Sequence, residues 1–286
     1  MNNFQQEGVG TRERGLRVTT RLSHIGILGT MIKVNLEKIY NCTSGNELVL
    51  VLPVFNEVSR NSNHFWEDLI SKTNIDFIFV DDASTDNSLD QLRLYSDNPN
   101  VGLIKLSRNS GKAEAIRQAF LSEAKESTNH RYIGYLDSDG AFPANEIVHH
   151  IPKAIEKLNN GFSIYSVSRV LLSGRNIDRR THRHIIGRMI RTLVGLRHKS
   201  LPYDTQSGFK LFWNDAIQAD IMAIPFKTKW FVDIEIMIRR KALSNNESYL
   251  WEEPAQTWTD IDNSSVNLRS SFQIISDLIQ ILRIEK

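Results

Sequence analysis

The sequence predicts an α/β fold with a mostly parallel central sheet flanked by helices. Continuous apolar runs of strand length alternate with amphipathic segments over residues 48–137. Unbroken runs are typical of parallel strands covered on both faces, and the alternation is typical of crossover helices between them. Polar and acidic residues follow the end of each run. Because ligands bind beyond the carboxyl ends of the strands in open α/β sheets, this pattern also predicts a binding site.

Four strands and three helices are expected in the first half of the chain. The apolar runs place strands at residues 48–53, 75–80, 101–106 and 132–137. Apolar residues at helical spacing place helices at residues 64–72, 84–94 and 113–125. Ser84 or Asp86 is suited to cap the second helix, because short polar side chains accept hydrogen bonds from the first helical amides.

The second half of the chain has less regular elements. We expect strands at residues 162–170 and 209–212, a helix at residues 230–240, and an extended segment at residues 251–258. The last helix, at residues 268–284, is amphipathic. Packing of its apolar face against the core is the simpler explanation of this pattern, and contact with a membrane is the alternative.

The bulk composition is that of an ordinary soluble globular chain. It has 286 residues, a hydrophobic content of 41% and a net charge of +2, so its overall charge does not indicate a binder of polyanions. The single cysteine, Cys42, excludes an internal disulfide framework and fits a reducing compartment. No apolar run reaches the roughly 18 residues that span a bilayer. We expect residues 1–45 to form a flexible extension with a short helix near residues 32–40, and residues 46–286 to form one domain.

Two carboxylates one residue apart, Asp137 and Asp139, follow the fourth strand. In an extended or turning segment, side chains at positions i and i+2 lie on the same side, so the two charges repel unless a cation lies between them. Oxygen ligands that leave positions open for substrate phosphates suit Mg²⁺ or Mn²⁺. A polar turn after a strand is the alternative explanation.

Two common nucleotide-binding motifs are absent. A dinucleotide site needs the pattern GxGxxG after the first strand, where this chain has PVFNEV. The residues Ser110-Gly111-Lys112 resemble the end of a phosphate-binding loop, but Leu106 stands at the position of the required earlier glycine and Ala113 replaces the metal-binding hydroxyl residue. The sequence therefore argues against a dehydrogenase and against a P-loop enzyme.

Six short stretches resemble the family 2 glycosyltransferases, which have the GT-A fold. The stretches occur in the order and with the spacing of the family, and together they span roughly residues 47–260. The likeness is greatest to dolichyl-phosphate glucosyltransferases and to polyprenyl-phosphate mannosyl- or glucosyltransferases. The six stretches are LPVFNE (52–57), VDDASTDNS (80–88), LSRNSGKAEAIRQAF (106–120), YLDSDGAF (135–142), DTQSGFKLF (204–212) and KWFVDIEIM (229–237).

The resemblance implies a single GT-A domain with two functional halves. Residues 46–145 would bind a nucleotide-diphospho-sugar donor, and residues 146–286 would bind the acceptor. The residues that the resemblance assigns to the donor are Pro53, Phe55 and Glu57 as the lining of the nucleotide pocket, Asp82 with Asp81 behind it as a contact of the base or ribose, and Lys112 beside the nucleotide.

The resemblance also implies a metal and catalytic residues. Asp137 and Asp139 match the metal-binding pair, with Asp139 favoured as the direct ligand of Mg²⁺ or Mn²⁺. The loop that contains Gln206 would face the donor sugar and diphosphate, and Asp233 matches the acid that serves as base in relatives with hydroxyl acceptors. Ala141 stands where some mannosyl enzymes carry glutamine, which favours glucose over mannose.

A strongly basic segment covers residues 169–199. It contains nine lysines and arginines against one acid, with apolar residues at helical spacing. A basic amphipathic helix is typical of binding to membrane surfaces or anionic ligands, and a solvated helix with one core face is the alternative. In the context of the family, Arg169, Arg179 and Arg183 would meet the acceptor phosphate. No recognised motif supports a nucleic-acid partner.

The leading hypothesis is an inverting glycosyltransferase that moves a hexose from a UDP-glucose-type or GDP-mannose-type donor to a polyprenyl phosphate. We expect a cytoplasmic protein, peripheral on the inner face of the membrane. One alternative is a soluble family 2 enzyme that acts on a glycan hydroxyl in polysaccharide or lipopolysaccharide synthesis. Another is a non-catalytic nucleotide-sugar-binding module, although the acids at 137, 139 and 233 favour an enzyme.

Overall fold

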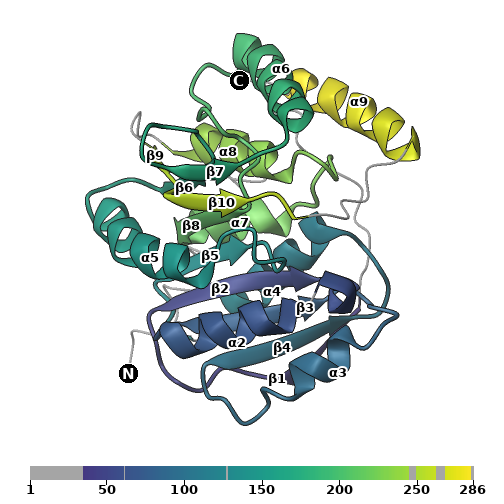
Figure 1. The fold of residues 1–286 in the computed structure, drawn as a ribbon, viewed down its shortest axis with the longest axis vertical. Helices are drawn as coiled ribbons and strands as arrows, with labels where there is room; N and C mark the ends of the chain where they lie inside the picture. The colour runs from purple at the N-terminus through teal and green to yellow at the C-terminus, as the bar shows by residue number, and fades with distance from the viewer. Residues whose placement is uncertain (1–34, 61, 127, 245–248, 262–267, 285–286) are drawn as a thin grey trace, which may run out of the picture.

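A central sheet organises the computed structural model, which describes residues 35–60, 62–126, 128–244, 249–261 and 268–284 (Figure 1). Within these residues the sheet has eight strands in the order β1-β4-β3-β2-β5-β8-β6-β9. The strands are β1 (Leu36–Tyr40), β2 (Leu48–Val54), β3 (Asp76–Asp81), β4 (Val101–Leu106), β5 (Tyr132–Leu136), β6 (Ile164–Ser168), β8 (Phe209–Trp213) and β9 (Leu250–Pro254). A separate parallel pair joins β7 (Asn176–Asp178) to β10 (Thr257–Thr259).

The middle of the sheet is parallel, which confirms the predicted fold class. Strands β4, β3, β2 and β5 are parallel neighbours, as are β6 and β9, whereas β1 and β8 run antiparallel to the strands beside them. The chain passes from β2 outward through β3 to β4 and then returns to β5 on the other side of β2. The carboxyl ends of β2 and β5 therefore form a topological switch point, the place where open α/β sheets bind ligands.

Helices cover both faces of the sheet. One face packs against α4 (Lys112–Lys125), α7 (Ala216–Ala223) and α8 (Val232–Leu243), and the other against α2 (Ser62–Lys72) and α5 (Ala144–Asn159). The strands serve both layers because successive side chains point to opposite faces: in β2, Val49 and Val51 join the first core, and Leu50 and Leu52 join the second. The remaining helices are α3 (Ser88–Arg93), α6 (Thr181–Arg197), α9 (Leu268–Arg283) and a short 3-10 turn, η1 (Val58–Arg60).

The helix expected near residues 32–40 is wrong for the part of that range that the structure describes. Residues Leu36–Tyr40 form β1, which pairs antiparallel with β4, and the Tyr40 hydroxyl donates to the Leu92 carbonyl at 2.6 Å. This strand adds an edge to the sheet from a stretch that we expected to be flexible. Residues 1–34, the rest of the expected extension, lie outside the described residues.

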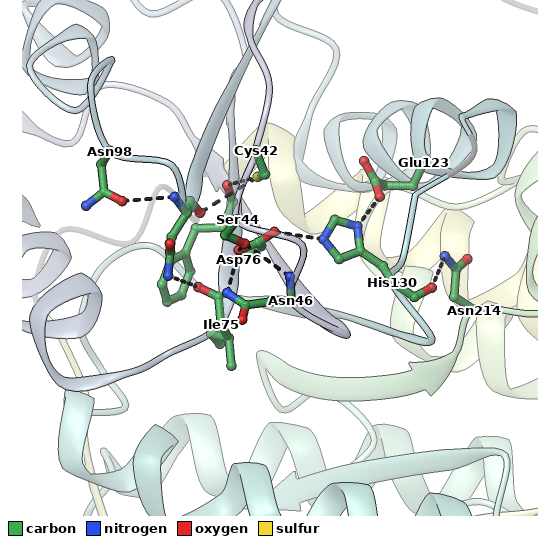
Figure 2. Close-up of polar contacts among 11 residues, drawn as sticks. Cys42, Ser44, Asn46, Ile75, Asp76, Asn98, Glu123, His130 and Asn214 are labelled. Carbon is green, nitrogen blue, oxygen red and sulfur yellow. Dashed lines mark hydrogen bonds and ion pairs between the residues drawn. The ribbon is translucent and has the colours of Figure 1, made fainter.

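A buried ionic network lies at the amino ends of the parallel strands, at the end of the sheet opposite the switch point (Figure 2). His130, which precedes β5, lies between two carboxylates: its Nδ1 is 2.6 Å from Glu123 of α4, and its Nε2 is 3.0 Å from Asp76 at the start of β3. Ser44 and Asn46 donate to the same Asp76 carboxylate. Burial alone would lower the pKa of His130, but its bonds to Asp76 and Glu123 outweigh burial and raise this pKa to about 9.

This network predicts a loss of stability in mild alkali. A histidine whose pKa rises on folding contributes stability that is complete below its unfolded pKa, about 6.5, and is lost as the pH passes its folded pKa of about 9. At 1.36 kcal/mol per pKa unit, the free energy of unfolding should fall by at most about 3 kcal/mol between pH 6.5 and 9.5. Urea denaturation across this range measures the fall. The variant His130→Asn should lose less of its free energy of unfolding across this range. The control His64→Asn, at an exposed position, should lose as much as the wild type. Equal dependence of this free energy on pH in all three proteins would contradict the assignment.

Candidate active site

A cavity of about 580 Å³ lies at the switch point, among the loops that follow β2, β3 and β5. Seven of the residues assigned to the donor or metal by sequence lie around it, which places them in a single site. Its lining residues are Pro53, Val54, Phe55, Asn56, Glu57, Ser59, Arg60, Asp82, Lys112, Asp137, Ser138, Asp139 and Trp230.

Two residues in the left-handed backbone region shape the loops after β2 and β3. Asn56 has φ 54° and Ala83 has φ 58°, a conformation that costs energy for residues other than glycine and that gathers at functional sites. The Asn56 side-chain oxygen accepts hydrogen bonds from the Thr85 amide at 2.8 Å and the Asp86 amide at 3.3 Å, so it ties the two loops together. These bonds hold residues 84–86 out of the predicted helix, which begins only at Ser88.

Asp82 shapes the loop that leads into α4. Its two carboxylate oxygens accept hydrogen bonds from the Ser110 and Gly111 amides, both at 2.7 Å, and burial raises its pKa in spite of these bonds. The neighbouring Asp81 is fully buried and accepts from the Ser84 amide at 3.2 Å. The structure thus gives both acids a role in holding loops, and the contact of Asp82 with a base or ribose stays a prediction.

Glu57 forms the wall of the cavity beside the acidic pair. It accepts hydrogen bonds from Arg60 at 2.7 Å and from the Ser62 hydroxyl at 3.1 Å. Burial raises the pKa of Glu57, and the Arg60 charge opposes that shift. Arg60 and Trp230 both line the cavity, and sequence reasoning gave neither of them a role: Arg60 lies outside the six stretches, and within 229–237 only the acids were singled out.

The acidic pair keeps one carboxylate paired and the other exposed to the cavity. Lys112, at the start of α4, forms an ion pair with Asp137, and the Ala141 amide donates to Asp139 at 3.1 Å. Burial and the negative charge of Asp137 raise the pKa of Asp139. The described residues contain no cluster of three or more metal-ligating side chains, so a cation here would rest on this pair and on phosphate oxygens. That arrangement suits Mg²⁺ or Mn²⁺, and the two carboxylates fit such an ion.

Gly208 allows the loop before β8 to approach Asp137 closely. The Asp137 amide donates to the Gly208 carbonyl at 2.9 Å, and a Cβ atom on Gly208 would overlap the Asp137 carboxylate. Gln206, in the same loop, donates to the Trp230 carbonyl at 3.4 Å. The structure therefore brings this loop against Asp137 of the acidic pair, although Gln206 itself is not among the lining residues of the cavity.

Asp233 lies beneath the cavity in a buried cluster of charges. It accepts hydrogen bonds from Lys210 Nζ at 2.8 Å and from the Tyr135 hydroxyl, and Lys210 also donates to the Ser207 carbonyl. Burial alone would raise the pKa of Asp233, but the charges of Lys210 and Lys112 outweigh burial, and the pKa is lowered. Sequence reasoning missed Lys210. The observation that could have identified it is that a charged residue within the apolar run Phe209–Trp213 needs a buried partner.

Glu235, two residues after Asp233, points elsewhere. Its carboxylate pairs with Arg239 at 2.6 Å and accepts hydrogen bonds from the amides of Lys227 and Thr228. This difference in direction follows from the spacing on a helix, where positions i and i+2 do not share a face. Glu235 is therefore a structural residue of α8.

The arginines assigned to the acceptor phosphate are only partly available. Arg169 forms a bidentate ion pair with Asp204, with bonds of 2.7 and 2.8 Å, and stacks over the Trp258 ring. Arg179 lies near this pair, and burial followed by the Arg169 charge lowers its pKa. The side chain of Arg183 lies outside the described part of the structure. The acceptor role of these three residues stays a prediction.

The parallel sheet, with its cavity and acidic pair at the switch point, has the architecture of α/β proteins that bind ligands at the carboxyl ends of their strands. The sequence profile described as glycosyl transferase family 2 matches residues 49–228. Because the match covers more than half of the chain, the protein belongs to glycosyl transferase family 2 and is a glycosyltransferase.

Comparisons with known proteins support this assignment. The chain is 27% identical over 250 residues to a dolichyl-phosphate beta-glucosyltransferase of Dictyostelium discoideum. This alignment covers 82% of the chain and 73% of the relative. It is 27% identical over 257 residues to the protein of the same name from Saccharomyces cerevisiae. That alignment covers 81% of the chain and 73% of the relative.

The fold is that of the GT-A glycosyltransferases. A solved structure of glucosyl-3-phosphoglycerate synthase from Mycobacterium tuberculosis, in complex with phosphoglyceric acid, superposes with a TM-score of 0.59 at 16% identity, over 85% of this chain and 82% of that one. The complex of the same synthase with Mn²⁺, UDP and glucosyl-3-phosphoglycerate gives a TM-score of 0.57.

The geometry of the acidic pair predicts that Asp139 supports metal-dependent donor binding. Asp139→Asn removes one of two carboxylates and should weaken UDP-glucose binding in the presence of Mn²⁺ by at least about tenfold, whereas binding without metal should change little. Titration calorimetry with and without Mn²⁺ measures the difference. Asp97→Asn, at an exposed position outside the cavity, is the control. Unchanged Mn²⁺-dependent affinity in a folded Asp139→Asn protein would reject the metal assignment.

Proposed function

We propose that the protein transfers glucose, with inversion, from UDP-glucose to a dolichyl-type polyprenyl phosphate. Three observations support the choice of substrates. The relatives named above, of which the chain covers nearly three quarters, are dolichyl-phosphate beta-glucosyltransferases. Ala141 stands at a position where glutamine would favour mannose. A structurally similar synthase was solved with UDP and Mn²⁺, which is consistent with a uridine donor and a divalent metal.

The state of Asp233 is the observation that carries the proposal for the acceptor. Its carboxylate is buried, bonded to Lys210 and Tyr135, and holds a lowered pKa, so it is a poor base. A hydroxyl acceptor needs a base, whereas a lipid phosphate is already ionised near neutral pH and needs only to be positioned. The site therefore suits a phosphate nucleophile better than a sugar hydroxyl.

The reaction follows from the proposed substrates. A phosphate oxygen of the acceptor attacks the anomeric carbon, and the bond from that carbon to the nucleoside diphosphate breaks, so the electron pair leaves with the diphosphate. Attack from the face opposite the leaving group inverts an α-linked donor to a β-linked product, which agrees with the names of the relatives. When bound at Asp137 and Asp139, Mg²⁺ or Mn²⁺ would neutralise charge on the diphosphate.

The chain's own residues orient the two substrates in this proposal. Pro53, Phe55 and Glu57 would hold the nucleotide, and Lys112 would add a positive charge beside the diphosphate. The basic stretch around Arg179 would attract the acceptor phosphate to the rim of the site. None of the described helices is long and apolar enough to cross a bilayer. Contact with the membrane would then be peripheral, with the lipid phosphate presented from its surface.

Replacement of Asp233 tests the proposed acceptor. Asp233→Asn should keep transfer to a short-chain polyprenyl phosphate within about tenfold of the wild type, because loss of a true general base typically costs ~10²–10⁴-fold. Thin-layer separation of labelled glucosyl phosphate measures the rate. Because this change leaves the Lys210 ammonium buried without its anion, the charge-balanced double variant Asp233→Asn/Lys210→Met is measured beside it. A hydroxyl acceptor would be favoured by two results together. The wild type would transfer glucose to glycans but not to the lipid phosphate, and both folded variants would lose the transfer to glycans.

A further inference from the structure

Two helices at one end of the molecule expose an unusual amount of apolar surface. Helices α6 and α9 contact each other and lie together at the upper end of Figure 1. Eight large apolar side chains on them are between 44% and 77% exposed, which is more than half of all such side chains among the described residues. These eight, here called the α6–α9 face, are Ile185, Ile186, Met189, Leu193, Leu196, Phe272, Ile275 and Ile279.

Core packing does not account for the α6–α9 face, because each helix already has a separate buried face. In α6, Ile190 and Val194 are buried, and in α9 Ile281 and the nearby Ile284 join the same core. In α9 the exposed residues are three and four positions apart on the side away from Ile281, and in α6 the exposed residues form an arc beside the buried one. The core-packing explanation for residues 268–284 is therefore incomplete: it accounts for one side of α9 and leaves Phe272 and Ile275 in solvent.

Among the described side chains of α6 and α9, the exposed charges are all positive. Helix α6 contains four arginines and no acid, and the single acid of α9 is Asp277. Asp277 is fully buried and accepts hydrogen bonds from the Lys229 and Trp230 amides at 2.7 and 2.9 Å, so it offers no charge to solvent. An apolar face bordered by cations and lacking exposed carboxylates is complementary to a membrane that carries anionic lipids.

The α6–α9 face is also connected to the donor cavity. Asp277 of α9 holds the amide of Trp230, and Trp230 lines the cavity beside Asp139. The Trp230 carbonyl in turn accepts a hydrogen bond from Gln206. The surface and the cavity are thus joined through a single buried carboxylate, so a lipid surface that holds α9 would lie at a defined position relative to the donor.

We propose that the α6–α9 face docks on an anionic lipid bilayer, with α9 as a second inserting helix beside the basic α6. The apolar side chains of both helices enter the boundary between headgroups and acyl chains, and the exposed Arg197 of α6 contacts the headgroups. This proposal rests on the proposed function, since it supplies the surface from which a polyprenyl phosphate would reach the site. A second copy of the chain is a less complementary occupant, because two such faces would bring like charges together.

Vesicle binding by matched apolar variants tests the docking proposal. The variant Phe272→Ser/Ile275→Ser/Ile279→Ser should bind vesicles of phosphatidylcholine with 30% phosphatidylserine at least about tenfold more weakly than the wild type, because three apolar side chains no longer leave water. Added salt should weaken binding of the wild type further. The control Leu94→Ser/Val148→Ser changes two exposed apolar residues on other elements and should bind like the wild type. Sedimentation of the vesicles measures each affinity.

A gain-of-signal variant keeps the test decisive if the triple variant is unstable. Phe272→Trp should become quenched by brominated lipids in the same vesicles beyond any quenching of the native tryptophans. Equal vesicle binding by wild type and a folded triple variant, or no added quenching of Phe272→Trp, would overturn the proposal. A dimer in solution that the triple variant abolishes, without vesicle binding by the wild type, would assign the face to a second copy instead.

The failure of docking and the failure of the proposed function are separable. Transfer of glucose to a water-soluble short-chain polyprenyl phosphate, without vesicles, should be the same for the wild type and the triple variant. If the wild type does not perform this transfer in solution, the proposed function is wrong whatever the vesicles show. If it does so and neither protein binds vesicles, the docking proposal alone is wrong.

Discussion

The candidate site is built around the ring of Tyr135 by two ion pairs, of which Lys210–Asp233 is buried and Lys112–Asp137 is partly exposed. Two acids, Asp137 and Asp233, lie near this ring, and each is neutralised by a lysine, Lys112 for the first and Lys210 for the second. A buried charge without its partner costs several kcal/mol, so the Lys210–Asp233 pair holds β8 against α8. The pairs come from four elements that are distant in sequence, which means that the cavity exists only when the sheet and α8 are assembled.

Close backbone approach completes this arrangement. Gly208 lets the loop before β8 rest on Asp137, and Lys210 holds the carbonyl of the preceding Ser207. The loop before β8, which is predicted to face the donor sugar, is therefore packed directly against the acidic pair. The backbone at Asn56 and Ala83 serves the same purpose on the other side of the cavity, because hydrogen bonds to Asn56 tie the loops after β2 and β3 together without any ligand. Such preorganisation is what transfer through a charged transition state requires.

The local sequence pattern predicted the fold class and the acidic residues that line the cavity. The features that it could not predict depend on contacts between residues distant in sequence. Continuous apolar runs revealed β2, β3 and β5, and the acids after them lie around the cavity as expected. The strand β1 was taken for a helix because its strand conformation depends on β4, more than sixty residues away. Lys210 was read as part of an ordinary strand because its partner Asp233 lies on another element. For α9, amphipathicity indicated a buried face but could not show that a second apolar face stays in solvent.

The central claim is that this GT-A site joins glucose to a lipid phosphate rather than to a hydroxyl. The most direct measurement is the structure of the product formed from UDP-glucose, Mn²⁺ and a short-chain polyprenyl phosphate, determined by ¹H and ³¹P nuclear magnetic resonance. We expect one product, in which the anomeric proton couples to phosphorus and also couples to H2 with the large trans-diaxial constant of a β-glucoside. A product with an α linkage would contradict inversion, and glucose found only on a glycan hydroxyl would contradict the lipid-phosphate acceptor.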